Sequence, residues 1–366
     1  TNRLDRSYIP QALTSILKSI ILFVAFSLFV PRVSYVGFAV TVMTIVQLIC
    51  NAINTHKLTP ELKIKLKPSE WLCSKNVIKK LVGSGIWNAI SNVGNMLLSG
   101  LDLIICNVFL GATPMGIISL SKTIPNYMQQ LSSSIRNAFA PELTIDYAHN
   151  NKEEMLKGIN RAMKLTSIIM TIPIAIVIVL GKSFFSLWVP TQDASLLQVL
   201  SVLAIFGYMF TSGTQILYNV FSTVNKVKQN SIAMILTGLV SATVTVLIIK
   251  TTNYGIYAVA GVSTFCNLIR NMVYTIPVTA KYLGFKWNIF YKQVFQTIIS
   301  SIVLVVIGYL LTAKIVINSW IMFLVAAVII GFAGILINGL IILNKEERKY
   351  LLDKVMKKLK LGEKNK

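Results

Sequence analysis

The chain has 366 residues, of which 54% are apolar and only 13% are charged. Soluble domains have about 45–50% apolar and about 25% charged residues, so this composition excludes a soluble enzyme, a disordered chain and a coiled coil. The 35 basic residues outnumber the 13 acidic ones and give a net charge of +22. Because the basic residues lie between apolar runs too long for a soluble core, a membrane is a better partner for them than a nucleic acid.

Ten apolar runs divide the sequence, and each can cross about 30 Å of hydrocarbon as a helix. Lipid cannot satisfy bare backbone groups, and runs of this length are not strands of a barrel. We therefore predict an all-α integral membrane protein with ten transmembrane helices. The predicted spans are 11–30, 34–52, 82–105, 113–138, 165–181, 195–221, 231–249, 254–277, 293–313 and 317–343.

The distribution of basic residues predicts the orientation. The two ends of the chain and the connections on their side of the membrane hold 27 Lys and Arg residues, whereas the connections on the other side hold 4. Lys and Arg accumulate on the cytoplasmic side of membrane proteins. We therefore predict a multi-pass protein of the cytoplasmic membrane with a cytoplasmic C-terminus. The basic, amphipathic tail suits the anionic inner leaflet.

The sequence has no signature of a catalytic or metal centre. It contains no Gly-rich phosphate loop and no paired Cys and His ligands, and its four cysteines are too far apart for a metal motif. The connections predicted to face outward are short and leave no room for an external catalytic domain. We expect a protein that is not an enzyme and has no cofactor. The coupling source stays open among the membrane potential, Na⁺ and H⁺.

Four predicted helices carry polar residues on one face, at alternating steps of three and four. A polar stripe in lipid is costly unless it faces other helices or water. Hydrogen bonding between helices is the alternative for any single Ser or Asn. The four stripes together predict a hydrated cavity. They are Asn88, Ser91, Asn92, Asn95, Ser99 and Asp102; Ser119, Lys122, Asn126, Gln129, Ser133 and Arg136; Tyr208, Thr211, Gln215, Tyr218 and Ser222; and Ser263, Asn267, Arg270, Asn271 and Tyr274.

Charged residues inside the spans are the sharpest signals, since charge at membrane depth usually marks a substrate or ion path. Lys122 lies too far from both ends of its span to reach water easily, whereas snorkelling is an alternative for Lys18, Arg136 and Arg270. Asp102 is predicted to pair with Lys122 across a short turn. A cavity with this net positive charge favours an anionic substrate such as a phosphate.

Pro125 and Pro173 interrupt two of the spans. A proline inside a transmembrane helix frees a carbonyl group and permits a kink. Because Pro125 stands next to Lys122 and Asn126, its kink would lie at the predicted cavity. A static bend and a hinge are both open.

The order and spacing of these segments resemble a known family. The residues that carry the resemblance are Lys80-Leu-Val-Gly-Ser-Gly-Ile-Trp, Leu101-Asp102-Leu-Ile-Ile-Cys, Leu110-Gly111-Ala, Met115-Gly116, Lys122 and Pro141-Glu142-Leu143. They resemble the second lobe of polysaccharide-export flippases, of the O-antigen, capsule or teichoic type. These belong to the multidrug/oligosaccharidyl-lipid/polysaccharide (MOP) superfamily, whose fold is MATE-like. Leu103 and Ile117 depart from the residues common there, which bears on the substrate more than on the fold.

The resemblance implies a fold of fourteen helices, with two six-helix lobes and a final pair. This chain would supply helices five to fourteen, the first four being absent. The expected domains are the rest of the N-terminal lobe (1–52), a cytoplasmic basic linker (53–81), the C-terminal six-helix lobe (82–277), the final helix pair (278–343) and a cytoplasmic basic amphipathic tail (344–366).

The resemblance also implies a function, in the membrane of a bacterium. Such flippases move a polyprenyl-pyrophosphate-linked oligosaccharide from the cytoplasmic to the outer leaflet, by alternating access around a cationic cavity. The expected partners are the lipid-linked oligosaccharide, membrane lipids and other polysaccharide-assembly proteins, with no nucleic acid. The expected substrate contacts are Lys18, Asn95, Asp102, Lys122, Asn126, Gln129, Arg136, Gln215, Tyr218, Asn267 and Arg270.

Other functions remain open at this point. An ion-coupled multidrug exporter of the same superfamily would need a carboxylate in the cavity, and Asp102 is the one visible in the spans. A peptidoglycan-precursor flippase is a second alternative. The short outer connections disfavour a membrane-embedded glycosyltransferase or ligase. The cost of keeping charged side chains in lipid disfavours a scaffold that transports nothing.

Overall fold

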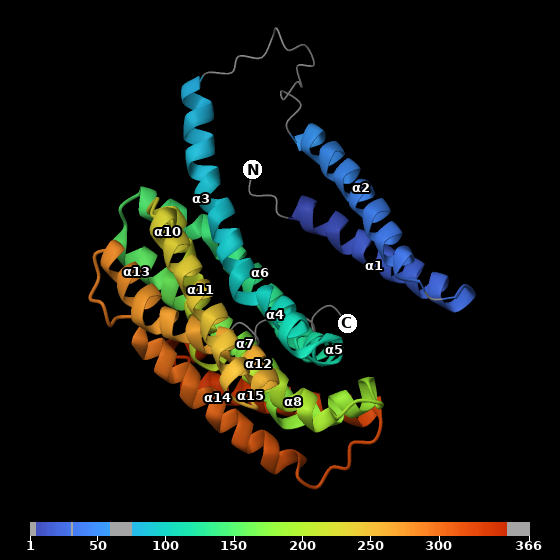
Figure 1. Cartoon of the computed structure of the whole chain (residues 1–366). Coiled ribbons are helices and arrows are strands. Elements are labelled where there is room, and N and C mark those ends of the chain that lie inside the picture. Colours follow the sequence, from blue (N-terminus) through green and yellow to red (C-terminus); the bar gives the residue numbers. More distant parts are fainter. Residues whose placement is uncertain (1–4, 31, 59–74, 350–366) are drawn as a thin grey trace, which may run out of the picture. The chain divides into compact units, whose positions relative to one another are not determined.

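The computed structural model describes residues 5–30, 32–58 and 75–349, and every regular element in these ranges is a helix (Figure 1). The chain divides into two compact units, Thr1–Ile78 and Lys79–Lys366. The predicted class, an all-α integral membrane protein, is confirmed. The predicted linker 53–81 and the tail 344–366 lie largely outside the described residues, so both stay predictions as domains.

Eight helices in the described part of the chain are long and apolar enough to cross a membrane. Eight of the ten predicted spans thus have the length and composition of a membrane-crossing helix, and the other two stay predictions. The two predicted spans that do not qualify, 113–138 and 254–277, are helical but are interrupted and carry charged residues. The eight are Ile9–Leu28, Val33–Leu58, Gly85–Leu110, Lys152–Trp188, Ala194–Thr211, Val227–Thr251, Tyr291–Thr312 and Trp320–Ile341.

The first unit contains a pair of long helices, α1 (Asp5–Leu28) and α2 (Val33–Leu58), which pack side by side (Figure 1). Most of their large apolar side chains are exposed, as expected for a surface that faces lipid. Helix α2 runs through Leu58 and helix α3 begins at Lys75, so both helices extend into the predicted linker 53–81.

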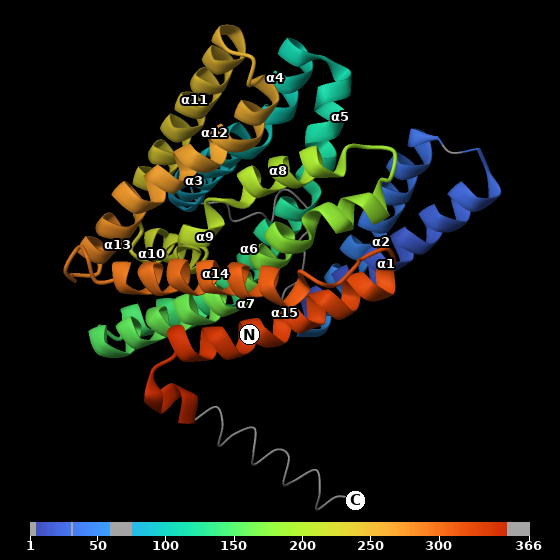
Figure 2. The same cartoon turned by 90° about the horizontal axis from the view of Figure 1, so that it is seen from below.

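The long helix α7 (Lys152–Trp188) forms the centre of the second unit and exceeds the predicted span 165–181 at both ends. It packs against α6 (Thr123–Ala148), α8 (Ala194–Ile205), α14 (Tyr291–Thr312) and α15 (Trp320–Ile341) (Figure 2). Fifteen of the 37 residues of α7 are buried, most of them apolar, and polar contacts align the helices that pack against it. The Thr171 hydroxyl and the Asn338 amide of α15 are hydrogen-bonded, which fixes two helices at membrane depth.

A second group of helices packs through small residues. It contains α3 (Lys75–Ser99), α4 (Leu101–Leu110), α5 (Ala112–Ser121), α11 (Val227–Thr251) and α12 (Gly255–Arg270). A Cβ atom on Gly238 would lie 2.7 Å from that of Leu97, and one on Gly94 would lie 2.9 Å from that of Met234. Glycine at these two positions therefore lets α3 and α11 approach closely.

Three predicted spans are interrupted. Residues 113–138 form α5 and α6, which meet at Lys122. Residues 195–221 form α8, α9 (Tyr208–Thr211), the 3₁₀ turn η2 (Gly213–Leu217) and α10 (Tyr218–Thr223). In the segment 254–277, α12 passes into the π-helical turn η3 (Asn271–Thr275), which α13 (Ile276–Tyr282) follows. Helix interruptions of this kind are common at functional sites.

A side chain from another helix replaces the backbone hydrogen bond that is lost at Pro125. Pro125 has no N–H group, so the carbonyl of Ser121, four residues earlier, loses its usual helical donor. The hydroxyl of Ser201 on α8 donates to that carbonyl at 2.7 Å, and both residues are fully buried. The bend before α6 is thereby satisfied without water.

Replacing Ser201 by Ala should lower the free energy of unfolding by about 1 kcal/mol, because the Ser121 carbonyl then stays buried without a donor. Thermal unfolding of the detergent-solubilised protein measures the effect. The double variant P125A/S201A restores an N–H group to the helix and should recover part of the loss. Equal stability of S201A and wild type would contradict this role.

An ion pair connects α7 to the segment after α15. Lys164 Nζ lies 2.8 Å from both carboxylate oxygens of Glu347, which also accepts the backbone N–H of Asn344. Burial acts to raise the pKa of Glu347, but the hydrogen bonds from Lys164 and Asn344 outweigh it and hold this pKa below its ordinary value.

The contact should therefore stabilise the protein at neutral pH and be lost in acid, because a carboxylate with a lowered pKa binds fewer protons in the folded state. We expect Glu347→Gln to lower the midpoint temperature of unfolding at pH 7. The difference from wild type should disappear as the pH falls through and below about 4.5. If the difference in midpoint temperature between the variant and wild type stayed constant over this pH range, the charge of Glu347 would not be the cause of the stabilisation.

Candidate functional site

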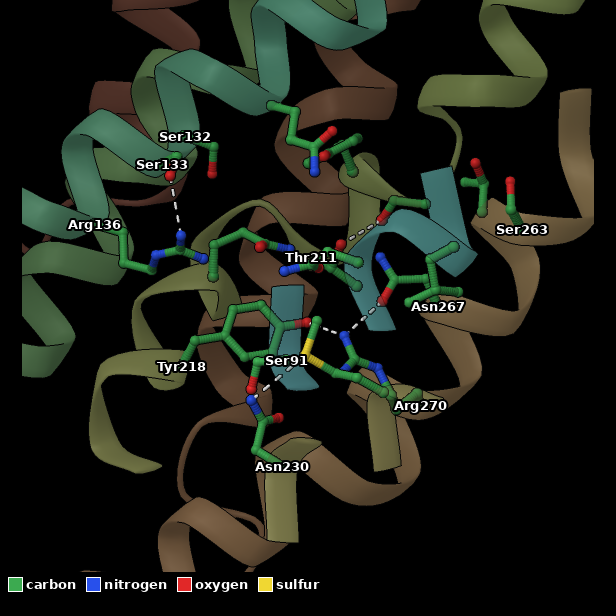
Figure 3. A pocket seen from close by; sticks show the side chains of 18 of the residues that line it. Ser91, Ser132, Ser133, Arg136, Thr211, Tyr218, Asn230, Ser263, Asn267 and Arg270 are labelled. Carbon is green, nitrogen blue, oxygen red and sulfur yellow. Dashed lines mark hydrogen bonds between the residues drawn. The ribbon is translucent and has the colours of Figure 1, made fainter. Parts of the chain in front are cut away.

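The second unit contains a polar cavity of about 560 Å³ (Figure 3). Residues of α3, α4, α6, α8, α10, α11 and α12 line it, together with α9 and η2 between α8 and α10. Three of the elements that surround it are interrupted at or near lining residues, namely Lys122, Gly207 and Arg270. The breaks in the helices thus occur at the level of the cavity.

Ten of the eleven predicted contact residues lie in the lining of this cavity. They are Asn95, Asp102, Lys122, Asn126, Gln129, Arg136, Gln215, Tyr218, Asn267 and Arg270. Lys18 lies on α1, in the first unit, and is half-buried there. The role of these residues in substrate binding stays a prediction.

An ion pair occupies one part of the lining. Lys122, at the junction of α5 and α6, donates to the carboxylate of Asp102, in the first turn of α4. The hydroxyl of Ser263 on α12 donates to the same carboxylate oxygen at 3.0 Å. The side chains of Lys122 and Asp102 are only 11% and 4% exposed. The pairing predicted from the sequence is confirmed, and the charge of Lys122 is compensated within the protein.

Two guanidinium groups flank one aromatic ring in another part of the lining. The guanidinium carbons of Arg136 and Arg270 lie 5.7 and 5.3 Å from the centre of the Tyr218 ring (Figure 3). At these distances both cations are attracted to the ring. Arg270 Nη2 also donates to the Tyr218 hydroxyl at 2.5 Å and to Asn267 Oδ1 at 2.8 Å. Arg136 Nη2 donates to Ser133 Oγ at 2.9 Å.

The two guanidinium groups differ from Lys122 in having no carboxylate partner among the described residues. Arg270 is 7% exposed, and its Nε and Nη1 atoms are buried without a hydrogen-bond partner in the described part of the chain. Buried donors that stay unpaired are costly, and charged ones more so. An anion at this place would offset that cost.

The described lining contains three basic residues and one acidic residue, and it therefore carries two net positive charges. Because Asp102 already compensates Lys122, the excess belongs to the pair of arginines. The rest of the lining is largely uncharged and rich in amides. The amide side chains are Asn92, Asn95, Asn126, Gln129, Asn137, Gln215, Asn219, Asn230 and Asn267.

Some lining residues were not predicted. Asn230 and Met234 belong to α11, whose sequence shows no polar stripe, and Asn230 falls in what reads as a connection. Asn137 and Asn219 stand directly beside Arg136 and Tyr218, so proximity in the sequence is a signal that could have found them. The Asn219 amide donates to the Arg136 carbonyl at 2.8 Å and so connects α10 to α6.

Comparisons with known proteins agree with a function in polysaccharide synthesis. Residues 8–189 match the model of a family described as polysaccharide biosynthesis protein. This match supports a family of polysaccharide biosynthesis proteins for the chain. It is also 21% identical over 357 residues to a Bacillus subtilis (strain 168) protein described as uncharacterized membrane protein EpsK, a match that covers 97% of this chain and 70% of that protein. No solved structure matches the chain. The findings together support a multi-pass membrane protein of polysaccharide biosynthesis.

The Asp102–Lys122 pair allows a test of charge compensation. Asp102→Ala should lower the free energy of unfolding by about 3 kcal/mol, because Lys122 is left nearly buried without its counter-ion. The double variant D102N/K122M should recover most of this loss, since it removes both charges. Chemical or thermal unfolding in detergent measures both variants. If the single variant were as stable as wild type, Lys122 would have to find another partner or water.

Proposed function

We propose that this protein is a transporter that moves a polyprenyl-pyrophosphate-linked oligosaccharide from the cytoplasmic to the outer leaflet. The proposal joins the family assignment, which points to polysaccharide biosynthesis, to a cavity whose lining suits both parts of such a substrate. The observation that carries it is the pair of guanidinium groups of Arg136 and Arg270, which have no carboxylate partner among the described residues.

The arginine pair provides the site for the pyrophosphate. Arginine presents several N–H donors in a fixed plane and binds phosphate oxygens in a bidentate manner. The Tyr218 ring lies close to both guanidinium groups and holds them near each other despite their repulsion. The unpaired Nε and Nη1 atoms of Arg270 gain acceptors when the phosphate binds.

The amide-rich part of the lining provides the site for the sugar. Sugar hydroxyl groups both donate and accept hydrogen bonds, and amide side chains do the same. Asn95, Asn126, Gln129, Gln215 and Asn267 are therefore proposed as contacts to the oligosaccharide. The many amides and few charges of the lining are compatible with sugars of different sequence. Which glycan is chosen is therefore set by the arrangement of these side chains and not by their chemical type.

The interrupted helices provide the means of opening. Alternating access requires two groups of helices to move around a fixed site, and broken helices near the binding site are typical of such transporters. The junction of α5 and α6 at Lys122 and the turn η3 after Arg270 lie next to the proposed contacts. Motion at these junctions would change the access to the cavity while preserving the central helix α7.

The orientation and the partners belong to the same proposal. The excess of basic residues on one side supports a cytoplasmic C-terminus, and we propose the cytoplasmic membrane of a bacterium as its location. The partners would be the lipid-linked oligosaccharide, membrane lipids and other proteins of polysaccharide assembly. We infer a transporter rather than an enzyme, because the cavity offers binding groups and the chain is a multi-pass membrane protein that matches a polysaccharide biosynthesis family.

Export of cationic drugs is the weaker alternative. A cationic drug requires a carboxylate, and Asp102, the one acidic residue in the described lining, is already paired with Lys122. A peptidoglycan-precursor flippase would carry the same pyrophosphate and stays a second alternative.

Deletion of the gene in its host should increase the amount of polyprenyl-pyrophosphate oligosaccharide in the inner leaflet, because synthesis continues while transport stops. Wild type should reverse this increase, and Arg270→Gln should not. Extraction and mass spectrometry of the lipid-linked pool, after treatment of spheroplasts with a glycosidase that cannot cross the membrane, distinguish the two leaflets.

Lys250→Gln is the matched control, since it removes a basic residue from α11 at a site outside the cavity, where Lys250 lies over the Phe109 ring. This variant should restore transport like wild type. Membrane abundance of each variant is compared by immunoblot. An unchanged lipid-linked pool on deletion, with altered sensitivity to cationic drugs, would contradict the proposal and favour a drug exporter.

A further inference from the structure

We propose that Tyr291, the first residue of α14, positions Arg270 for the pyrophosphate of the substrate, although Tyr291 lies outside the lining of the cavity. The inference rests on the proposed function and adds a residue that sets the affinity of the site from a distance. Tyr291 acts through the π-helical turn η3, which begins directly after Arg270. Its hydroxyl donates to the carbonyl of Met272, inside that turn, at 2.5 Å.

The turn η3 leaves one backbone carbonyl without a helical donor. The N–H of Ile276 donates to the carbonyl of Asn271, five residues earlier, and not to that of Met272 as it would in an α-helix. In a π-helix the donor for Met272 would be residue 277, but Pro277 has no N–H group. The Tyr291 hydroxyl therefore replaces a donor that the helix itself lacks.

The turn η3 also determines the direction in which the end of α12 faces. A π-helical turn contains one residue more than an α-helical turn, so its loss rotates the two flanking helices against each other by about 100°. Arg270, the last residue of α12, donates to the Tyr218 hydroxyl, and this hydroxyl donates to Asn271 Oδ1 at 2.7 Å (Figure 3). Two consecutive residues at the start of η3 thus contact one atom of α10, and both contacts depend on the turn.

Both helices that η3 joins are anchored by buried side chains. Val259 and Ala260 of α12 are fully buried in a cluster with residues of α4, α5 and α8. Ile276 and Ala280, on the other side of most of η3, are fully buried in a cluster with residues of α7 and α14. Because these anchored parts cannot take up a rotation, a change from π-helical to α-helical geometry falls on the residues between them, which include Arg270.

The hydrogen bonds around Arg270 form a connected set that depends on its orientation. Asn267 Oδ1 accepts from Arg270 at 2.8 Å and from the Asn271 amide at 3.3 Å. The Asn271 amide also donates to the Asn267 carbonyl at 2.9 Å. The Nε and Nη1 atoms of Arg270 have no partner among the described residues. The orientation that η3 imposes therefore leaves these two donors for the phosphate oxygens of the substrate.

Loss of the Tyr291 hydroxyl should weaken this site without removing any group from it. The Met272 carbonyl then regains a helical donor, the Ile276 N–H, only if η3 returns to α-helical geometry. That return turns Arg270 away from Tyr218 in a fraction of the molecules. The apparent Kd for the substrate rises as the fraction of molecules with a competent site falls.

The test measures the Kd of farnesyl pyrophosphate, a short polyprenyl pyrophosphate, by calorimetry with the full-length protein in detergent. Tyr291→Phe removes the hydroxyl and keeps the ring that packs against Trp287. It should raise the Kd by about fivefold, the equivalent of one hydrogen bond. Tyr309→Phe is the matched control, because Tyr309 also belongs to α14 and donates to a backbone carbonyl, that of Ile178, away from η3. Y309F should bind the probe like wild type.

Two double variants show whether the hydroxyl acts through Arg270 and through the Met272 carbonyl. R270Q should itself raise the Kd, and Y291F/R270Q should bind like R270Q, because no guanidinium is left to position. P277A restores an N–H group at residue 277, which makes the hydroxyl dispensable, so Y291F/P277A should bind like P277A. This last pair replaces the comparison of Y291F with wild type if Y291F does not accumulate in the membrane.

The outcomes distinguish the inference from the proposed function. Equal Kd values for Y291F and wild type, with R270Q impaired, would contradict the inference alone. It would also be overturned if Y291F raised the Kd by the same factor in the wild-type and R270Q backgrounds, since the hydroxyl would then act on the fold in general. An equal rise in the wild-type and P277A backgrounds would exclude the Met272 carbonyl as the link. No binding of the probe by wild type, or equal binding by wild type and R270Q, would contradict the proposed function and the inference with it.

Discussion

The cost of placing a charged side chain in hydrocarbon is the constraint on which this structure depends. The charge of Lys122 is compensated by the carboxylate of Asp102. The charges of Arg136 and Arg270 are offset only in part, by one tyrosine ring and by neutral hydrogen-bond acceptors. Compensation is therefore complete for Lys122 and incomplete for the two arginines of the cavity, and that difference locates the proposed anion site.

The same constraint applies to the backbone. At two of the breaks beside the cavity, a side chain from a neighbouring helix donates to a backbone carbonyl. Ser201 donates to the Ser121 carbonyl, and Thr264 donates to the Ala204 carbonyl next to the break at Gly207. These contacts allow interrupted helices to persist inside a membrane protein, and they join the elements that alternating access would have to separate or slide.

Much of this arrangement could be predicted from the sequence, because the spacing of polar residues on a helix follows from its period. Lys122 and Asp102 lie on facing stripes joined by a short turn, and their pairing is confirmed. The contact of both arginines with Tyr218 could not be predicted, since it depends on how α6, α10 and α12 are rotated against one another. The breaks at Gly207 and at η3 have no proline inside them, and the sequence therefore read as continuous helix there.

Transbilayer movement in a purified system tests the central claim most directly. Proteoliposomes are prepared with the full-length protein and a polyprenyl-pyrophosphate oligosaccharide, and a glycosidase that cannot cross the membrane is added outside. With wild type, the cleaved fraction should rise from the outer-leaflet share to nearly the whole pool, whereas with R136Q/R270Q it should stay at the outer-leaflet share. Equal cleavage with both proteins, or with empty liposomes, would contradict transport through the arginine-lined cavity.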